Sequence, residues 1–436
     1  MRVLVPVSIA ALALIPSAAR HARADAGPGS GSGSDSGSGS DSFDSVLADA
    51  RPSLRTDGTF NAAPSDSDSD SDSDSGSDAG SASDSASAST PDHHTLTVGG
   101  YLQPQLRLRQ DDPQVGFDED GFRVRRARLE LGDEVRYGRL RLRARIEVEV
   151  ATQVELQDGY VSAESCLRGG GGWRIDAGQL KVPVSRQALL SDSRLAFVEK
   201  PELASLAPDR QLGAAGTVTV PYAPWLVVSG GMFDGEGKNQ GGNVDQRFLY
   251  AGRIEVRPLG RDVKLAESAL GGDYVVVGAS AAQNRIATGA DVERTRTLGA
   301  DLAFGWHGVS GAVEYLEVRH HRRLGGYPDF RANGIDVQLA YLVPLPGRWD
   351  RHLEIGARLD EIDRNDAVPI ERPGDPEQSL RSYHLAATWY QRGHDLKLQI
   401  DAAHIVEVED ITRNRVDARY RNDTVLVQAT YRLEAP

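Results

Sequence analysis

Strict alternation of charged and apolar residues over residues 139–150 constrains the fold more than any other feature of the sequence. In this segment, RLRLRARIEVEV, every odd position is charged and every even position is apolar. A helix would spread that pattern around its circumference, whereas a strand places odd and even positions on opposite faces. The apolar face of such a strand could line the core of a soluble sandwich. It could equally meet lipid in a membrane barrel, with the charged face toward a water-filled lumen.

Similar two-faced segments recur along the rest of the chain. We predict sixteen strands, at residues 94–109, 121–134, 138–151, 153–164, 173–180, 211–220, 225–233, 246–258, 272–282, 294–306, 309–320, 330–343, 351–362, 380–391, 394–406 and 423–433. No amphipathic helix pattern longer than two turns interrupts them, and no long apolar run follows the N-terminal region. The sequence therefore predicts an all-β protein.

The lengths of the connections alternate along the chain. Short turns are predicted at 135–137, 221–224, 307–308 and 392–393. Long polar connections are predicted at 110–120, 181–210, 234–245, 283–293, 319–329, 363–379 and 407–422, whereas 151–153 and 259–271 break the alternation. In a soluble sandwich, short and long connections are not expected to alternate along the chain. We therefore predict a 16-stranded antiparallel transmembrane β-barrel of the cell outer membrane, with short periplasmic turns and long external loops.

Aromatic residues near the predicted strand ends support a membrane barrel. Such barrels carry aromatic girdles at both membrane interfaces. The predicted girdle residues are Trp173, Trp225, Phe233, Trp306, Trp349, Trp389, Tyr390 and Tyr431.

The first 92 residues differ in composition from the rest of the chain. Residues 1–24 have the pattern of a secretory signal peptide, with Arg2 before an apolar stretch and an Ala-x-Ala site, and we expect cleavage after Ala24. Residues 25–92 hold 14 Asp against two Arg, and most of the others are Ser, Gly and Ala. That composition cannot bury enough apolar area to fold. We therefore predict a disordered spacer at 25–92 and a barrel domain at 93–436.

Several segments resemble the phosphate-selective porin O and P family, over roughly residues 95–433. They are GFRVRRARLEL at 121–131, GQLKVPVS at 178–185, VEKPELASLAPDRQLG at 198–213 and RGHDLKLQID at 392–401. The resemblance implies a trimeric sixteen-stranded barrel, inserted by barrel-assembly machinery, whose third external loop folds inward and constricts the pore. It also implies that basic residues on the wall and on that loop guide anions, phosphate in the best-known members. The chain departs from the family in its mixed-sign lumen face, which includes Glu147, Glu149 and Glu155, and in lacking a terminal aromatic residue.

Basic side chains form the predicted solute site. Arg141, Arg143 and Arg145 share the polar face of one strand. In the preceding strand, alternation reverses between Arg125 and Arg126, so a β-bulge there would turn arginines on both sides of it to the lumen. Guanidinium groups suit oxyanions because they stay charged and offer a planar fork of donors, and several weak sites release an ion more readily than one tight site. The predicted substrate-binding residues are Arg141, Arg143, Arg145, Arg126, Arg128, Lys181 and Arg186.

No enzyme, catalytic residue, metal site or cofactor is predicted. The sequence holds no HExxH, GxSxG or P-loop motif, and the two residues of His93-His94 or of His320-His321 would point to opposite strand faces. The predicted partners are membrane lipid, small anionic solutes and further copies of the chain in a homotrimer, with no nucleic acid. Three functions remain open: a channel for small anions such as phosphate, a general diffusion porin whose lumen charges pair across strands, and an envelope-tethering barrel that acts through its spacer.

Deleting residues 25–92 should leave the channel conductance unchanged, because a disordered spacer makes no packed contact with a barrel. Single-channel recording in planar bilayers measures the conductance, and mild proteolysis of the full chain should remove this segment first. An N-terminal segment that resists the protease would contradict the spacer.

Overall fold

The computed structural model describes residues 93–110, 120–243, 245–260, 267–288, 291–322, 329–344, 352–366, 379–407 and 423–435. The predicted signal peptide and spacer lie outside these residues, as do Trp349 and the central parts of several predicted loops. Within the described ranges, no helix is long and apolar enough to cross a membrane.

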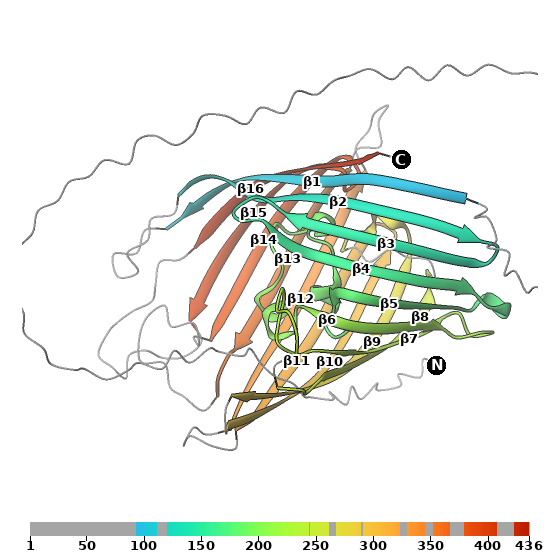
Figure 1. Cartoon of the computed structure of the whole chain (residues 1–436). Helices are drawn as coiled ribbons and strands as arrows, with labels where there is room; N and C mark the ends of the chain where they lie inside the picture. Colours follow the sequence, from blue (N-terminus) through green and yellow to red (C-terminus); the bar gives the residue numbers. More distant parts are fainter. Residues whose placement is uncertain are drawn as a thin grey trace, which may run out of the picture. The chain divides into compact units, whose positions relative to one another are not determined.

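Sixteen antiparallel strands close into one barrel, which confirms the predicted fold class (Figure 1). The strands are β1 His93–Arg109, β2 Gly121–Tyr137, β3 Leu140–Glu149, β4 Glu155–Cys166, β5 Gly172–Lys181, β6 Arg210–Thr219, β7 Leu226–Phe233, β8 Leu249–Leu259, β9 Tyr274–Thr288, β10 Asp291–Trp306, β11 Val309–Arg322, β12 Phe330–Pro344, β13 His352–Asp363, β14 Leu380–Arg392, β15 Leu396–Glu407 and β16 Thr424–Ala435. The short helices are η1 Arg168–Gly170, α1 Arg186–Leu189, η2 Asp192–Arg194, η3 Glu202–Leu206 and η4 Ala269–Gly271.

Pairing of the first strand with the last closes the barrel. Gln105 of β1 lies opposite Arg123 of β2 on one side and opposite Gln428 of β16 on the other. Closure matters because lipid offers no hydrogen-bond partner to the N–H and C=O groups of an edge strand. The pairing therefore makes a lipid-exposed sheet possible.

Tight turns gather at one end of the barrel. Gly138–Arg139 joins β2 to β3, so the turn lies directly after the predicted residues 135–137. His307 and Gly308 join β10 to β11 with φ of 48° and 85°, and positive φ at both positions suits a two-residue hairpin. β1 begins at this end, since His93 lies opposite Arg136. In outer-membrane barrels the end with short turns is periplasmic.

The prediction of a long external loop at 283–293 is wrong, because most of these residues belong to strands β9 and β10. β9 continues to Thr288 and β10 begins at Asp291, with Ala287 opposite Val292. Polar residues on both faces had indicated a loop. Outside the membrane both faces of a strand can meet water, so polarity alone does not end a strand there.

The expected bulge lies in β2. Gln103 is opposite Arg126, whereas the next residue, Pro104, is opposite Val124. Arg125 is therefore the extra residue. Arg125 and Arg126 both contact Glu199 inside the barrel, so neither faces lipid.

Alternation assigns the two faces of the wall. On β3, Leu142 and Ile146 are exposed on the outside, whereas Glu147 is buried inside. This matches the two-faced pattern that first indicated a strand, with the apolar face directed at lipid.

The predicted aromatic girdle is correct only in part. Trp306, Trp389 and Tyr431 are exposed near the periplasmic ends of their strands. Phe233 and Tyr390 are fully buried inside the barrel, so their assignment to a girdle is wrong. Position near a strand end does not reveal which face a side chain occupies.

The connection between β5 and β6, residues 182–209, folds into the barrel, and we call it the inner loop (Figure 1). Its helix η3 packs on β11, β12 and β13. Leu203 belongs to an apolar cluster with the inward residues Leu316, Val318 and Ile362 of those strands. The wall opposite the predicted arginines is therefore partly apolar because it receives this loop.

Unboiled and boiled samples should migrate differently on a detergent gel, because a barrel closed by hydrogen bonds resists dodecyl sulfate until it is heated. Far-ultraviolet circular dichroism of the unboiled sample should report β-sheet. Identical migration of the two samples would contradict a closed barrel.

Candidate functional site

Wall carboxylates hold the inner loop by accepting hydrogen bonds from it. Glu314 of β11 accepts from the backbone amides of Arg186 and Gln187, at 2.9 Å each. Asp360 of β13 accepts from the amide of Glu202 at 2.5 Å. These amides begin α1 and η3, where N–H groups have no partner within the helix. The carboxylates therefore fix the starts of both helices.

Further contacts attach the middle of the inner loop to the β8–β9 connection and to β15. Glu267 accepts from the amide of Ala196 at 2.8 Å, and the Lys397 ammonium donates to the carbonyl of Leu195 at 2.5 Å. Five carboxylates, four on wall strands and Glu267 in the connection between β8 and β9, accept from the loop in this way, and each is at most 6% exposed. These anchoring carboxylates are Glu267, Glu314, Asp336, Asp360 and Asp401.

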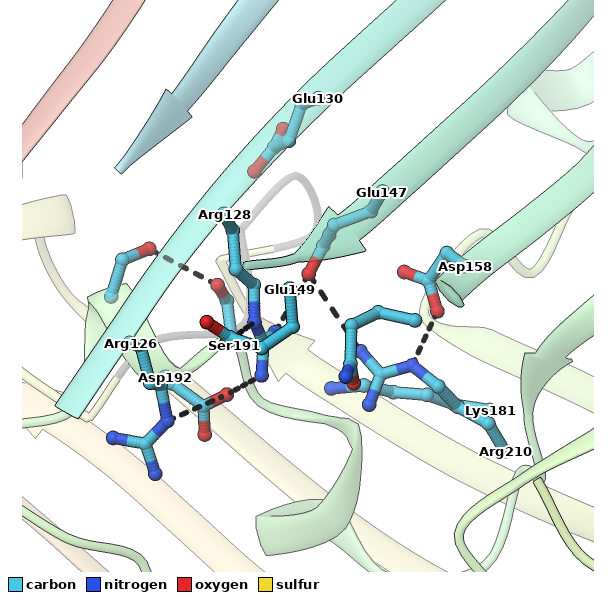
Figure 2. Close-up of polar contacts among 12 residues, drawn as sticks. Arg126, Arg128, Glu130, Glu147, Glu149, Asp158, Lys181, Ser191, Asp192 and Arg210 are labelled. Carbon is cyan, nitrogen blue, oxygen red and sulfur yellow. Dashed lines mark hydrogen bonds and ion pairs between the residues drawn. The ribbon is translucent and has the colours of Figure 1, made fainter. Parts of the chain in front are cut away.

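Ion pairs attach the other side of the inner loop to β2 (Figure 2). Asp192 lies 2.8 Å from Arg128 Nη2 and 3.5 Å from Arg126 Nε. Glu199 lies 2.6 Å from Arg125 Nε and 2.9 Å from Arg126 Nη2. The loop is therefore clamped between two walls of the barrel.

The charges of this clamp persist at neutral pH. Burial alone would raise the pKa of Asp192, but Arg126, Lys200 and Arg128 outweigh it and hold that pKa well below its usual range. Burial also opposes ionisation of Glu199, whose pKa is nevertheless lowered, chiefly by Arg126. A carboxyl group with a lowered pKa stabilises the fold at pH values above its unfolded pKa. That stabilisation is lost only as the pH falls through the lowered value, so mild acid should leave the clamp intact.

Two lysines bind the carbonyls at the end of α1. Lys181 Nζ donates to the carbonyls of Leu189 and Leu190, at 3.1 and 2.7 Å. Lys200 Nζ donates to the carbonyls of Leu190 and Ala188, at 2.8 and 3.1 Å. Cations are favoured at the C-terminal end of a helix. Both ammonium groups therefore act on the shape of the loop.

Gly178 turns Lys181 inward. Asp176 is buried on the lumen side before it, and Gln179 is buried on the lumen side after it, so the alternation of β5 shifts by one residue. Gly178 has φ of 135°, and a Cβ there would lie 2.2 Å from the carbonyl oxygen of Gly159. Only glycine fits this position.

Ion pairs continue from the clamp into neighbouring strands (Figure 2). Arg128 lies 2.6 Å from Glu147 and 3.1 Å from Glu149, both on β3. Arg210 of β6 lies 2.6 Å from Asp158 of β4. The mixed signs of the lumen face thus form a ladder of opposite charges across strands.

The arginines of β3 lie on the periplasmic side of this ladder. Glu134 lies 3.3 Å from Arg141 and 2.7 Å from Arg143, and Glu164 lies 2.7 and 3.2 Å from the same two residues. The side chains of Arg141, Arg143 and Arg145 are 33%, 35% and 38% exposed. They are paired yet remain accessible to water in the lumen.

The seven predicted site residues therefore fall into two groups. Arg141, Arg143 and Arg145 are accessible, as a solute-binding group must be. Four others are held inside the protein. Arg126, Arg128 and Arg186 are buried, at 7%, 9% and 2% exposure. Lys181 is bonded to carbonyls of the inner loop. A solute cannot reach these four unless the inner loop moves.

Sequence reasoning missed the anchoring carboxylates. Alternation places Glu314 and Asp360 on the inner faces of their strands, and this signal is visible in the sequence. Nothing in the sequence shows that the loop covers them.

Comparisons with known proteins agree with the barrel. A family model described as phosphate-selective porin O and P matches residues 101–433. No curated protein matches the chain significantly. An anion-selective porin from Comamonas acidovorans is similar in structure, with a TM-score of 0.52 and 14% identity over 79% of this chain and 100% of that one.

OmpT, an outer membrane protein of Vibrio cholerae, is also similar in two solved structures. A loop L8 deletion mutant has a TM-score of 0.51 and 10% identity. The in-vitro folded trimer form has a TM-score of 0.51 and 11% identity. Each alignment covers 78% of this chain and 100% of the OmpT chain. At such low identities these likenesses show a shared fold.

Replacing Glu314 with alanine should loosen the inner loop, because two buried N–H donors lose their acceptor, at about 1–3 kcal/mol for each unsatisfied group. We expect larger current fluctuations in single-channel recordings and faster protease cleavage within residues 182–209. The matched control is Glu164→Ala, which removes a lumen carboxylate whose ion pairs are with Arg141 and Arg143 of β3. Equal fluctuations in the two variants would show that Glu314 does not hold the loop.

Proposed function

This chain belongs to the phosphate-selective porin O and P family, and on that premise we propose that its lumen guides small oxyanions such as phosphate. Family and barrel together identify an outer-membrane channel rather than an enzyme.

The proposal rests on one observation: carboxylates anchor the inner loop on one side of the lumen, whereas arginines line the other side. The anchoring carboxylates of one side are buried under the inner loop and bonded to it. Strands β1–β3 on the other side together carry inward arginines from the external to the periplasmic end of the wall, and we call these the arginine track. They are Arg107, Arg109, Arg123, Arg125, Arg126, Arg128, Arg136, Arg141, Arg143 and Arg145.

The accessible members of this track suit passing oxyanions. A guanidinium group offers a planar fork of donors to phosphate and keeps its charge at all physiological pH values. Arg141, Arg143 and Arg145 share their charge with Glu130, Glu134, Glu147 and Glu164, which weakens each single contact with a solute. Weak, successive sites favour conduction, because an ion must leave each site as readily as it enters.

The ion pairs also favour a second candidate, a general diffusion porin of weak selectivity. Arg141 and Arg143 each contact two carboxylates. A wall of fully paired charges could serve only to keep the lumen hydrated. The two candidates differ in whether the arginines act on ions.

We also propose that the channel is a homotrimer, as the family resemblance implies; one similar protein, OmpT of Vibrio cholerae, was solved in a trimer form. The signal peptide at 1–24 and the spacer at 25–92 remain predictions, as does the envelope-tethering function that would depend on the spacer.

Replacing Arg141, Arg143 and Arg145 together with glutamine should shift the reversal potential in a salt gradient toward the cation value. It should also weaken block of chloride current by phosphate. The physical reason is that fixed charges in a narrow passage are poorly screened compared with charges in bulk water. Planar-bilayer recording measures both quantities.

The matched control is Glu134→Gln with Glu164→Gln, which removes the acidic partners and leaves the arginines. This variant should shift the reversal potential in the opposite direction, toward anions. If both variants fold, as shown by gel migration, and neither changes the reversal potential, the arginines are structural and the general porin is the correct function.

A further inference from the structure

Arginines also gather on the outer surface of the barrel, at the external ends of β9–β12. Arg296 of β10 lies directly opposite Arg319 of β11, and Arg319 lies directly opposite Arg331 of β12. Three like charges thus occupy neighbouring positions on three adjacent strands. The group, which we call the outer arginine patch, consists of Arg285, Arg294, Arg296, Arg319 and Arg331.

Alternation places the patch on the face that meets lipid. Leu302 of β10, Val313 of β11 and Val337 of β12 are exposed and share parity with the arginines of their own strands. The residues of opposite parity beside the patch, Val318 and Ala332, are buried inside the barrel. The patch therefore points away from the channel, and no solute in the lumen can reach it.

The patch lies at the level of the external membrane interface. The exposed aromatic residues Trp306 and Tyr341 mark the periplasmic ends of β10 and β12. Arg296 is ten residues from Trp306, and Arg331 is ten residues from Tyr341. Ten residues of a tilted strand span roughly 25 Å along the membrane normal, which equals the height of the apolar band of an outer-membrane barrel. The arginines thus reach the depth of the lipid headgroups.

Within the described ranges, the outer arginine patch has fewer acidic partners than arginines. Glu317 lies 2.9 Å from Arg319 and 4.0 Å from Arg331, which also pairs with Asp366 at 3.3 Å. Among the residues that the structure describes, no carboxylate pairs with Arg285, Arg294 or Arg296. Like charges directly opposite each other destabilise a sheet. An external anion would remove that penalty.

We propose that the outer arginine patch binds the phosphate groups of an anionic phosphorylated glycolipid in the outer leaflet. Arginine recognises phosphate through paired, charge-assisted hydrogen bonds. Basic clusters beside a membrane attract anionic headgroups in the same way. A second copy of the chain is a poorer occupant, because it would have to bury several arginines that lack carboxylate partners.

Native mass spectrometry of the full-length protein in nonionic detergent tests the proposal, with bis-phosphorylated lipid A and dephosphorylated lipid A as the probes. Wild-type protein should bind the phosphorylated probe at least about tenfold more tightly. The variant Arg296→Gln with Arg319→Gln should bind it roughly 30-fold more weakly, as expected when two arginine–headgroup contacts are lost. Its binding of the dephosphorylated probe should not change.

Arg381→Gln is the matched control. Arg381 also faces outward near the external end of its strand, but it has its own partner, Glu361, at 2.7 Å. This variant should bind the phosphorylated probe as the wild type does. The single variant Arg296→Gln offers a second test, because it relieves like-charge repulsion and should fold at least as stably as the wild type in detergent without lipid.

Equal affinity of wild-type protein for the two probes would overturn the proposal, as would unchanged binding of the phosphorylated probe in the double variant or a loss of stability in the single variant. A double variant with altered oligomer mass and unaltered lipid binding would assign the patch to contact between copies. That result would also overturn lipid recognition. None of these outcomes depends on ion selectivity.

Discussion

The hydrogen-bonded ladder that closes between β1 and β16 is the constraint on which the rest of the structure depends. Backbone groups in lipid have no other partners, so every strand must be paired on both sides. Once the ladder is closed, each residue has a fixed face, and one extra residue exchanges the faces of all that follow. The bulge at Arg125 shows the effect, because it lets Arg125 and Arg126 both contact Glu199 inside the barrel.

The interior is organised by hydrogen bonds between the wall and the inner loop. Glu314 and Asp360 accept backbone amides at the starts of two short helices, while Asp192 and Glu199 on the loop pair with arginines of β2. Acidic residues thus hold the loop from both directions. The consequence is an uneven lumen, in which one side is covered and the side bearing the arginine track remains accessible at β3.

Arginine side chains have two different roles in this barrel. Some hold the fold together in buried ion pairs, and others remain exposed to water or lipid. Arg128 is sequestered by three carboxylates, whereas Arg143, on the next strand, is about one-third exposed although it is also paired. On the outside, Arg296, Arg319 and Arg331 face one another without enough acidic partners. Ionic contacts inside the barrel are therefore largely satisfied within the protein, whereas the outer arginine patch has fewer carboxylate partners than arginines among the described residues.

Local pattern in the sequence determined the strands, their two faces and the bulge, because a period of two depends only on neighbouring residues. It also indicated which acidic and basic side chains point inward. The tertiary structure alone decided which of them meet: the sequence predicted Lys181 at the start of a loop, whereas it ends β5, and its contacts with Leu189 and Leu190 arise from the path of the inner loop. Likewise, the strand that replaces the predicted loop at 283–293 is specified by pairing between β9 and β10. Hydrogen bonds between distant segments decide such features, and a local pattern of polarity does not contain them.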